Sequence, residues 1–324
     1  MALDISTLQS PFIDQLSFGL AKSAVLGLET LKYVDVRTDV NGSLQLNTID
    51  STINFTNTTC STTDTGSTVF AGNTLETCFV ASNQDICIED LQRVWYGKYL
   101  SKSVMGATDL GTFQDFIMSE KADKIGQELE KLIWIGVKDA SPFSGLTAAG
   151  VQGGSGNGAM CDGFIQKAYM LSATTPSAQE LIRTAFTVSN AIVNVDNIYG
   201  AAPDRIKGRE DLRLFLSPSD FDKYLSGLRN ANYFHFASSD KNISEILHPG
   251  ARNLKVTKVN GMTNVLSGTF ILTYSENMVF GTLAEKDFMA IDGIFDPYNR
   301  KYKVSPRFRV GVQFVFGQDL VRNL

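Results

Sequence analysis

The sequence has few of the residues on which most catalytic sites depend. Its 324 residues include only two histidines, His235 and His248, and their spacing fits neither H-E-x-x-H nor a cysteine/histidine zinc pattern. A Ser-His-Asp or Cys-His site would need one of them, and the first candidate thiol, Cys161, lies in no sequence that marks a nucleophile. We therefore expect no catalytic residue, no metal ion and no cofactor. An acidic site assembled from distant residues leaves no such pattern, so an enzyme stays open as an alternative.

Cysteine is also scarce. The four cysteines, at positions 60, 78, 87 and 161, form no C-x-x-C pair. Domains stapled by disulfides are usually small and dense in cysteine, and this chain is neither. We expect four reduced thiols in a protein of the cytoplasm.

A long hydrophobic run is missing as well. The most apolar early stretch, 18–34, is interrupted by Lys22, Glu29 and Lys32, whereas a helix that crosses a bilayer needs about 20 apolar residues. The first residues lack the basic start of a secretory signal. We expect a protein that is made and used without export and that has no membrane partner.

Positive charge is absent from one long stretch. The whole chain carries 29 basic and 34 acidic residues, a net charge of -5, which excludes a surface that attracts DNA everywhere. Residues 38–92 contain no lysine or arginine, and their acidic residues are Asp39, Asp50, Asp64, Glu76, Asp85, Glu89 and Asp90. A group of cations lies near the end of the chain instead: Arg300, Lys301, Lys303, Arg307 and Arg309. An acidic projection either stays solvated or meets a basic partner.

The glycine-rich run 150–158 suggests a phosphate-binding loop at first sight. It lacks the G-K-[ST] ending of a P-loop, and it fails G-x-G-x-x-G because Cys161 stands where the third glycine belongs. A flexible turn between two structural units accounts for it better.

Local patterns in the first half of the chain predict three elements. An apolar stripe between Ile13 and Leu31 predicts an N-terminal helix. Residues 38–80, rich in threonine, serine and asparagine with interspersed glycine, predict a long polar β-hairpin. Apolar residues three and four apart predict a helix over 112–135 that ends at Gly136. At 1.5 Å per residue this helix would be roughly 36 Å long.

The second half mixes helices with strands. We expect a helix that begins at Thr175-Pro176 and runs through Ile192, then a strand over 212–216 and a helix capped by Ser217. Strands follow at 254–259, 269–274 and 278–282, and alternation of apolar residues from 307 to 316 predicts a long last strand. The fold class is α+β.

This order of elements resembles the major capsid protein of tailed bacteriophages, which has the Hong Kong 97 fold. The segments that carry the resemblance are QELEKLIWIG at 127–136, LFLSPSDF at 214–221 and RFRVGVQF at 307–314, with Asp139, Pro142, Gly145 and Leu146. They are similar to the end of the family's spine helix, the strand-to-helix step of its axial domain and its last peripheral strand.

The resemblance implies a division of the chain. Residues 1–37 would form an N-terminal arm, 38–80 an extended hairpin loop, 81–159 a peripheral domain that contains the spine helix, 160–285 an inserted mixed α/β axial domain, and 286–324 the returning peripheral strands.

The implied function is structural. Copies of the chain would assemble into hexamers and pentamers of an icosahedral phage head that encloses double-stranded DNA, with portal and scaffolding proteins as further partners. Assembly would take place in the host cytoplasm. The alternatives are an encapsulin-like compartment that holds an enzyme, a secreted threonine-rich adhesin, and an enzyme of another kind.

Particular residues follow from this resemblance and from the charge pattern. The acidic loop, through Asp50, Asp64 and Glu76, would lie over a neighbour's basic strands, through Arg300, Lys301, Lys303, Arg307 and Arg309. The hinge candidates are Gly136, Gly153, Gly154 and Gly156. The loop has no lysine, so the covalent subunit linkage of some family members is not expected. The subunit should be flat and elongated, with the hairpin projecting from its body.

Overall fold

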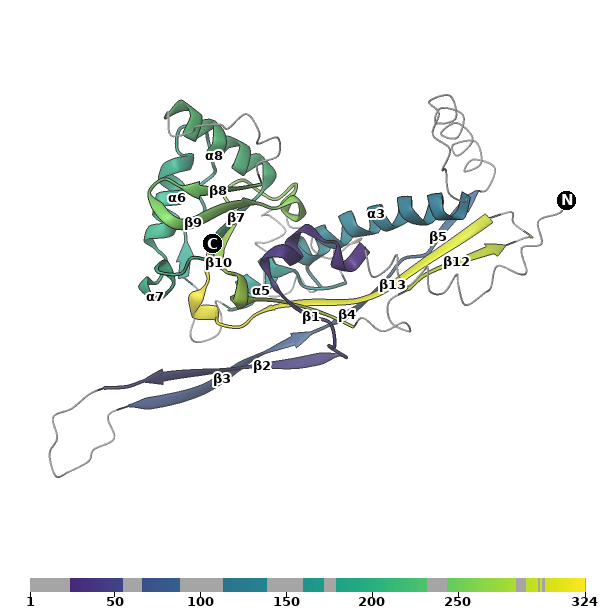
Figure 1. Cartoon of the computed structure of the whole chain (residues 1–324), viewed down its shortest axis with the longest axis horizontal. Helices are drawn as coiled ribbons and strands as arrows, with labels where there is room; N and C mark the ends of the chain where they lie inside the picture. Colours follow the sequence, from purple (N-terminus) through teal and green to yellow (C-terminus); the bar gives the residue numbers. More distant parts are fainter. Residues whose placement is uncertain are drawn as a thin grey trace.

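A computed structural model describes residues 24–54, 66–87, 113–138, 160–171, 179–231, 244–283, 290–296, 298 and 301–323. These residues form two six-stranded sheets and a separate two-stranded hairpin, combined with helices. Figure 1 shows an elongated molecule in which the hairpin projects from a body that holds both sheets. The predicted α+β class and the elongated shape are confirmed for this part of the chain.

The first sheet is organised around one long strand, β13. Its path runs β1-β11-β13-β12, and β4 and β5 also pair with β13. The strands are β1 (Asp35–Arg37), β4 (Cys78–Ala81), β5 (Gln84–Cys87), β11 (Met278–Thr282), β12 (Ala290–Asp296) and β13 (Lys301–Phe314). The predicted alternation is confirmed, since Phe308, Val310, Val312 and Phe314 are all buried.

The bounds of β13 differ from the predicted 307–316. The strand begins at Lys301 because β12 pairs with residues 301–307, a contact that no local pattern reveals. It ends at Phe314 because the Asn277 side chain binds both backbone groups of Phe316: Oδ1 accepts from N at 2.6 Å and Nδ2 donates to O at 3.0 Å. A side-chain amide thus replaces the next strand pair.

Two helices lie along this sheet. The predicted long helix is present as α3 (Phe113–Ile135), and α5 (Phe164–Leu171) packs beside its end. Trp134 near the end of α3 is fully buried, and its ring centre lies 5.3 Å from that of Phe164 and 5.2 Å from that of Phe215. Its indole N–H donates to the Thr30 hydroxyl at 2.6 Å, so the polar atom of this buried ring is satisfied.

The second sheet has the order β6-β14-β10-β7-β9-β8. Its strands are β6 (Gln179–Leu181), β7 (Leu212–Leu216), β8 (Glu245–His248), β9 (Ala251–Lys258), β10 (Phe270–Tyr274) and β14 (Val321–Asn323), and its helices are α6 (Ala191–Gly200), α7 (Asp204–Lys207) and α8 (Pro218–Asn230). Short 3-10 turns occur at Glu29–Tyr33 (η2), Asn260–Met262 (η3), Ser275–Asn277 (η4) and Gly317–Asp319 (η5).

Three of the six strands of this second sheet were predicted, together with one helix cap. The strands near 212–216, 254–259 and 269–274 are confirmed as β7, β9 and β10, and Ser217 caps α8 by accepting from the Asp220 N–H at 3.3 Å. β14 lies within the range expected to return to the peripheral sheet, yet it pairs with β10 and β6. The range 286–324 therefore contributes to both sheets.

The prediction of a helix from Thr175 through Ile192 is wrong in the described residues, which begin at 179. Residues 179–181 form β6 instead, which pairs in parallel with β14 from the far end of the chain. The actual helix, α6, begins at Ala191 after a turn in which the Asn190 side chain accepts from the Thr187 N–H at 2.7 Å. A distant strand and local polar contacts thus overrode the apolar spacing.

Two other expected features lie largely outside the described residues. Only the end of the predicted N-terminal helix, from Ala24, is described, and the glycine run 150–158 falls between described segments. Among the described helices, none is long and apolar enough to span a membrane.

Alternation along β7 connects two hydrophobic cores. Leu214 and Leu216 pack with α6 and α8 on one face of the second sheet. Phe215 points to the other face and joins the core that contains Trp134, α5 and the buried face of β13. The second sheet is therefore packed on both faces, and the two sheets are joined through a shared core.

A buried carboxylate belongs to the same region. Glu130 of α3 accepts hydrogen bonds from the hydroxyl and, at 3.5 Å, the backbone N–H of Thr30. Burial raises the pKa of Glu130 above its ordinary value, and the bonds from Thr30 offset part of this rise. The folded chain therefore holds this proton at pH values where the unfolded chain has released it.

The first prediction is that Glu130→Gln flattens the pH dependence of stability. Because the folded-state pKa is raised, the stabilisation from Glu130 is complete below the ordinary glutamate pKa and is lost as the pH rises through the raised value. Thermal unfolding midpoints between about pH 4 and pH 8 should fall less in the variant than in the wild type. Glu128→Gln, at an exposed position of the same helix, is the control and should follow the wild type. A wild-type slope in Glu130→Gln would contradict the assignment.

Candidate functional site: the projecting hairpin and its base

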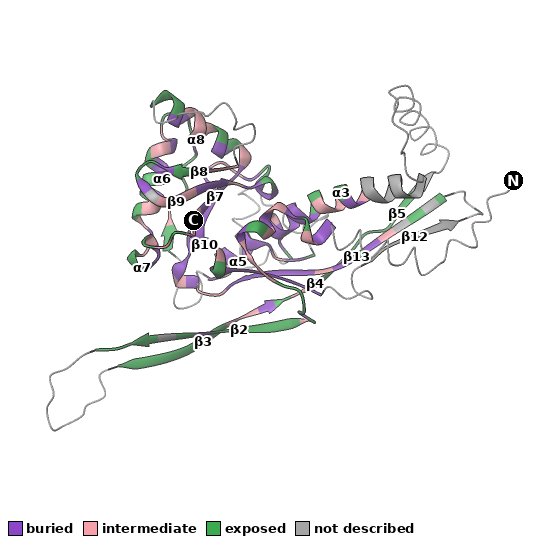
Figure 2. Ribbon diagram, viewed as in Figure 1, coloured by how far each residue is buried: buried purple, intermediate pink, exposed green. Residues whose placement is uncertain are grey.

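The hairpin consists of β2 (Ser43–Thr52) and β3 (Ser67–Glu76), ten residues each, paired antiparallel along their whole length. At about 3.3 Å per residue it extends about 33 Å. Figure 2 shows that most of it is exposed; its buried residues are Leu75 near the body and Thr48 midway along β2. The predicted projecting hairpin, with few contacts back to its own body, is confirmed for the described residues.

One face of the hairpin exposes large apolar side chains. Ile49 and Phe70 stand directly opposite each other in the register, with 62% and 76% of their surfaces exposed, and Ile53 further along is 74% exposed. Hydroxyl side chains join the strands nearby, for example Ser51 to Thr68 at 3.2 Å. An isolated two-stranded hairpin is marginally stable in water, and exposed apolar patches mark contact surfaces. The stability of the hairpin therefore depends on its base.

The base rests on two glycines of the first sheet. Gly281 of β11 and Gly311 of β13 are register partners. A Cβ on Gly311 would overlap the carbonyl oxygen of Glu76, and one on Gly281 would lie 2.7 Å from Cδ2 of Leu75. The end of β3 thus crosses the sheet at backbone contact, which only glycine permits.

Polar and apolar contacts fix this crossing. The Asn73 amide donates to the carbonyls of Phe314 and Val315 at 2.9 and 3.0 Å, and the Gln313 amide donates to the carbonyl of Thr74 at 2.9 Å. Leu75 is fully buried in a small cluster with Val40 and Val279. The hairpin base also covers Gln313, whose side chain is buried.

A turn at the base sets where the two strands leave the body. The backbone N–H and the hydroxyl of Thr77 donate to the carbonyl of Gly42 at 2.8 and 3.1 Å. Gly42 has a φ of +90°, which disfavours any residue with a Cβ. The chain then continues from Thr77 into β4, which pairs with β13.

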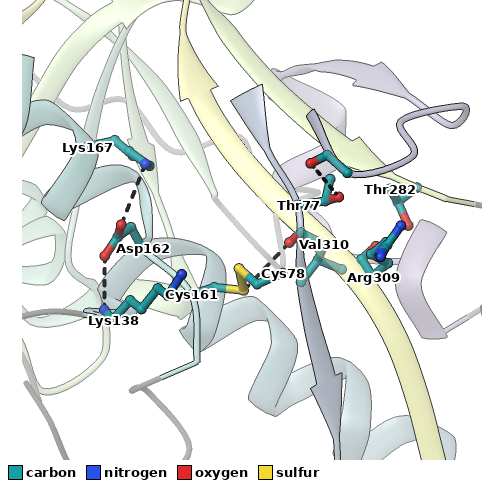
Figure 3. The surroundings of a disulfide bond; sticks show 10 residues. Thr77, Cys78, Lys138, Cys161, Asp162, Lys167, Thr282, Arg309 and Val310 are labelled. Carbon is teal, nitrogen blue, oxygen red and sulfur yellow. Dashed lines mark hydrogen bonds and ion pairs between the residues drawn. A yellow bond between two sulfur atoms is a disulfide. The ribbon is translucent and has the colours of Figure 1, made fainter. Parts of the chain in front are cut away.

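A disulfide joins this base to the body. Cys78, the first residue of β4, is bonded to Cys161, and their Cα atoms are 5.8 Å apart (Figure 3). The expectation of four reduced thiols is therefore wrong for this pair. The two cysteines are 83 residues apart in sequence and meet only because β4 and the start of α5 both pack against β13, which sequence spacing does not reveal.

The predicted acidic residues are only partly described. Glu76 is exposed at the hairpin base opposite Ser43, and Asp50 stands opposite Val69 in the register of β2 and β3. Asp64 lies outside the described residues.

The predicted basic residues lie along β13. Lys301 forms an ion pair with Asp85 of the same chain at 3.4 Å. The Arg309 guanidinium binds the Asn41 side chain and lies 5.2 Å from the ring centre of Phe79. Lys303 and Arg307 are exposed on the same strand, and Arg300 lies outside the described residues. Own-chain partners thus occupy Lys301 and Arg309, and a contact to a neighbour stays a prediction.

Of the glycines predicted as hinges, the structure describes only Gly136. This residue follows α3, and a Cβ there would overlap the carbonyl oxygen of Cys161 and lie 2.6 Å from that of Leu132. Close packing therefore explains the glycine, and a hinge role stays a prediction. Gly153, Gly154 and Gly156 lie outside the described residues.

Candidate catalytic features are few in the described part of the chain. No group of three or more His, Cys, Asp or Glu residues there could hold a metal ion. His248 is buried, with Nδ1 2.7 Å from the Tyr224 hydroxyl and Nε2 2.8 Å from an Asp196 carboxylate oxygen. These contacts link β8 to α8 and α6, so His248 holds the strand against the two helices. His235 lies outside the described residues.

Comparison with known proteins gives a result only at the level of structure. No sequence model of a protein family and no curated protein matches the chain. The satellite phage P4 procapsid, which includes the size determination (Sid) protein, matches with a TM-score of 0.53 at 14% identity, over 94% of this chain and 96% of that one. The capsid of Myoviridae phage XM1 matches with a TM-score of 0.55 at 11% identity, over 92% of each chain.

The chain has the Hong Kong 97 capsid fold. A virus-like particle from Pyrococcus furiosus also matches, with a TM-score of 0.50 at 10% identity, over 97% of this chain and all of that one. The predicted resemblance is confirmed at the level of the fold.

Two features of the base were missed in the sequence: the glycine pair and the disulfide. A glycine inside a strand pattern signals close approach of another backbone, and Gly281 and Gly311 both interrupt such patterns. No comparable signal exists for the disulfide.

The second prediction concerns this glycine pair. Gly311→Ala should lower the free energy of unfolding by about 1–3 kcal/mol, because the new Cβ meets a backbone carbonyl that cannot rotate away. Chemical denaturation measures this difference. Gly208→Ala is the matched control, since a Cβ there meets nothing within 4 Å, and it should change stability little. Equal stabilities of the two variants would show that the crossing is not tight.

Proposed function

We propose that this chain is the major capsid protein of a tailed phage, and that many copies form the hexamers and pentamers of an icosahedral head around double-stranded DNA. The observation that carries the proposal is the fold, which matches capsid structures over more than nine-tenths of both chains. The exposed apolar face of the hairpin supports it independently, because a projecting two-stranded element needs a partner outside its own chain.

On this proposal the parts of the chain take the names used for such subunits. Residues 1–37 are the N-terminal arm, 38–80 the extended loop, and 160–285 the axial domain. Residues 81–159 and 286–324 are the peripheral domain, with β14 completing the axial sheet and β11, from the range 160–285, completing the peripheral sheet. The glycines at 136, 153, 154 and 156 are the points where the shell bends.

The hairpin is the proposed contact between neighbouring copies. Its face with Ile49 and Phe70 would be buried on a second copy, and its acidic residues would lie near the cations of that copy's β13. Exposed ion pairs contribute about 0–1 kcal/mol each, so the apolar contact and repetition over the shell would supply the strength.

The cargo and the further partners belong to the proposal as well. A portal, a scaffolding protein and assembly in the host cytoplasm fit a phage head. The second candidate function is an encapsulin-like compartment, favoured by the match to the Pyrococcus furiosus virus-like particle. Nucleic acid inside purified particles distinguishes the two.

The third prediction tests assembly and cargo together. Purified wild-type protein should form closed particles in negative-stain electron microscopy, and particles from infected cells should contain nuclease-protected DNA. The double variant Ile49→Ser, Phe70→Ser should lose most of this assembly while the thermal midpoint of the unassembled chain stays within about 1–2 °C, because both residues are exposed in the free subunit.

Ile182→Ser serves as the control, since it removes an apolar side chain that is 83% exposed away from the hairpin. It should assemble normally. Normal particles from the double variant would contradict the hairpin contact, and the absence of particles both from the purified wild type and from infected cells would contradict the shell function.

The fourth prediction concerns charge. Asp64→Lys and Lys301→Glu should each weaken assembly at low salt, and their combination should restore part of it. Lys301 also pairs with Asp85 of its own chain, so Asp85→Asn is needed as a control for the loss of that pair. If Asp85→Asn weakens assembly as much as Lys301→Glu, or if the double reversal restores nothing, Asp64 and Lys301 are not in contact between copies.

A further inference from the structure

We propose that Cys78 and Cys161 form a redox lock on the hairpin base. The contacts of Asn73, Gln313 and Leu75 set the direction of the hairpin, and the disulfide adds a covalent restraint on it that two thiols lack. The structure contains the oxidised form.

The first reason is the position of Cys78. Only Thr77 separates it from the last residue of the hairpin strand β3, so any swing of the hairpin passes directly to β4. β4 is four residues long and is held by four register pairs to β13, from Cys78↔Val310 to Ala81↔Arg307. A force at the end of a hairpin about 33 Å long acts on this short strand with a large lever arm. A covalent bond at its first residue restrains that motion most effectively.

The second reason is the rigidity around Cys161. The Gly163 N–H donates to the carbonyl of Gly136 at 2.7 Å. The Lys138 N–H donates to the Asp162 carboxylate at 2.9 Å, as Figure 3 shows. Asp162 also pairs with Lys167 at 3.5 Å. Cys161 is thus embedded where α3 ends and α5 begins, and the disulfide ties the projecting element to this fixed corner.

The site accommodates both redox states. The separation of 5.8 Å between the Cα atoms lies in the range that disulfides require. In the reduced state the Cys161 thiol can donate to the carbonyl of Val310, which is 3.6 Å from its sulfur, so the buried thiol keeps a polar partner. Neither state leaves Cys161 without a contact.

The chemistry is a thiol–disulfide exchange. The thiolate of one cysteine attacks a small disulfide such as oxidised glutathione and releases one glutathione thiolate. The second cysteine then displaces the other glutathione from the mixed disulfide. In total one S–S bond forms and one breaks, two protons leave the protein thiols, and the small disulfide is reduced by two electrons to two thiols.

The timing of the lock rests on the proposed function. Reducing conditions in a cytoplasm keep thiols open while subunits assemble and adjust, and an oxidising medium closes the bond in released particles. Closure of an 83-residue loop also restricts the unfolded chain, which adds thermal stability after assembly.

The test uses the purified, unassembled full-length chain, so its outcome does not depend on shell formation. After oxidation with oxidised glutathione, peptide mapping without reductant should find the Cys78 peptide linked to the Cys161 peptide. Reduction should lower the thermal midpoint by about 3–7 °C and should speed amide exchange of residues 77–81. Cys78→Ser should behave as the reduced chain under both conditions, whereas Cys87→Ser should keep the full redox response.

Two results would overturn the lock. One is free, alkylatable Cys78 and Cys161 after oxidation, or either of them bonded to a different cysteine. The other is a linked pair whose reduction lowers the thermal midpoint without changing amide exchange at residues 77–81. The bond would then stabilise the folded chain as a whole without restraining the hairpin.

Discussion

The backbone contact at the base of the hairpin is the constraint on which the projecting part of the molecule depends. Two strands of ten residues have no core of their own, so their direction is set where β3 meets the first sheet. Gly281 and Gly311 let the strand end approach to contact, and the amides of Asn73 and Gln313 bind it there. A side chain at either glycine would separate these groups, and the exposed apolar face would lose its fixed orientation relative to the body.

A fixed orientation of the hairpin requires a rigid body, and the packing of the body explains its rigidity. Alternate residues of β7 enter two different cores, so the second sheet cannot move relative to α6 and α8 on one face or Trp134 on the other without opening a cavity. Trp134 further connects α3 to α5 and, through its indole N–H, to the segment before β1. Removal of such a buried ring typically costs about 3–5 kcal/mol. The hairpin therefore projects from a body that is packed as a single unit.

Elements with a strong local signal were predictable from the sequence, and those made by distant contacts were not. The stripe of α3, the Ser217 cap of α8 and the alternation from Phe308 to Phe314 each depend on neighbouring residues, and all are confirmed. β6 depends on β14, the start of β13 depends on β12, and the disulfide joins residues 83 apart. The hairpin was predicted from composition, but its exposed apolar face was not, because Ile49 and Phe70 become opposite partners only once the register is known.

The central claim is that copies of this chain cover one another's hairpins in a closed shell. Cryo-electron microscopy of the assembled wild-type protein tests it most directly, because a map at side-chain resolution shows what lies against each face of β2 and β3. We predict a closed icosahedral particle in which the face with Ile49 and Phe70 is buried on an adjacent copy. A protein that stays monomeric, or a particle whose hairpins are exposed to solvent on both faces, would contradict this account.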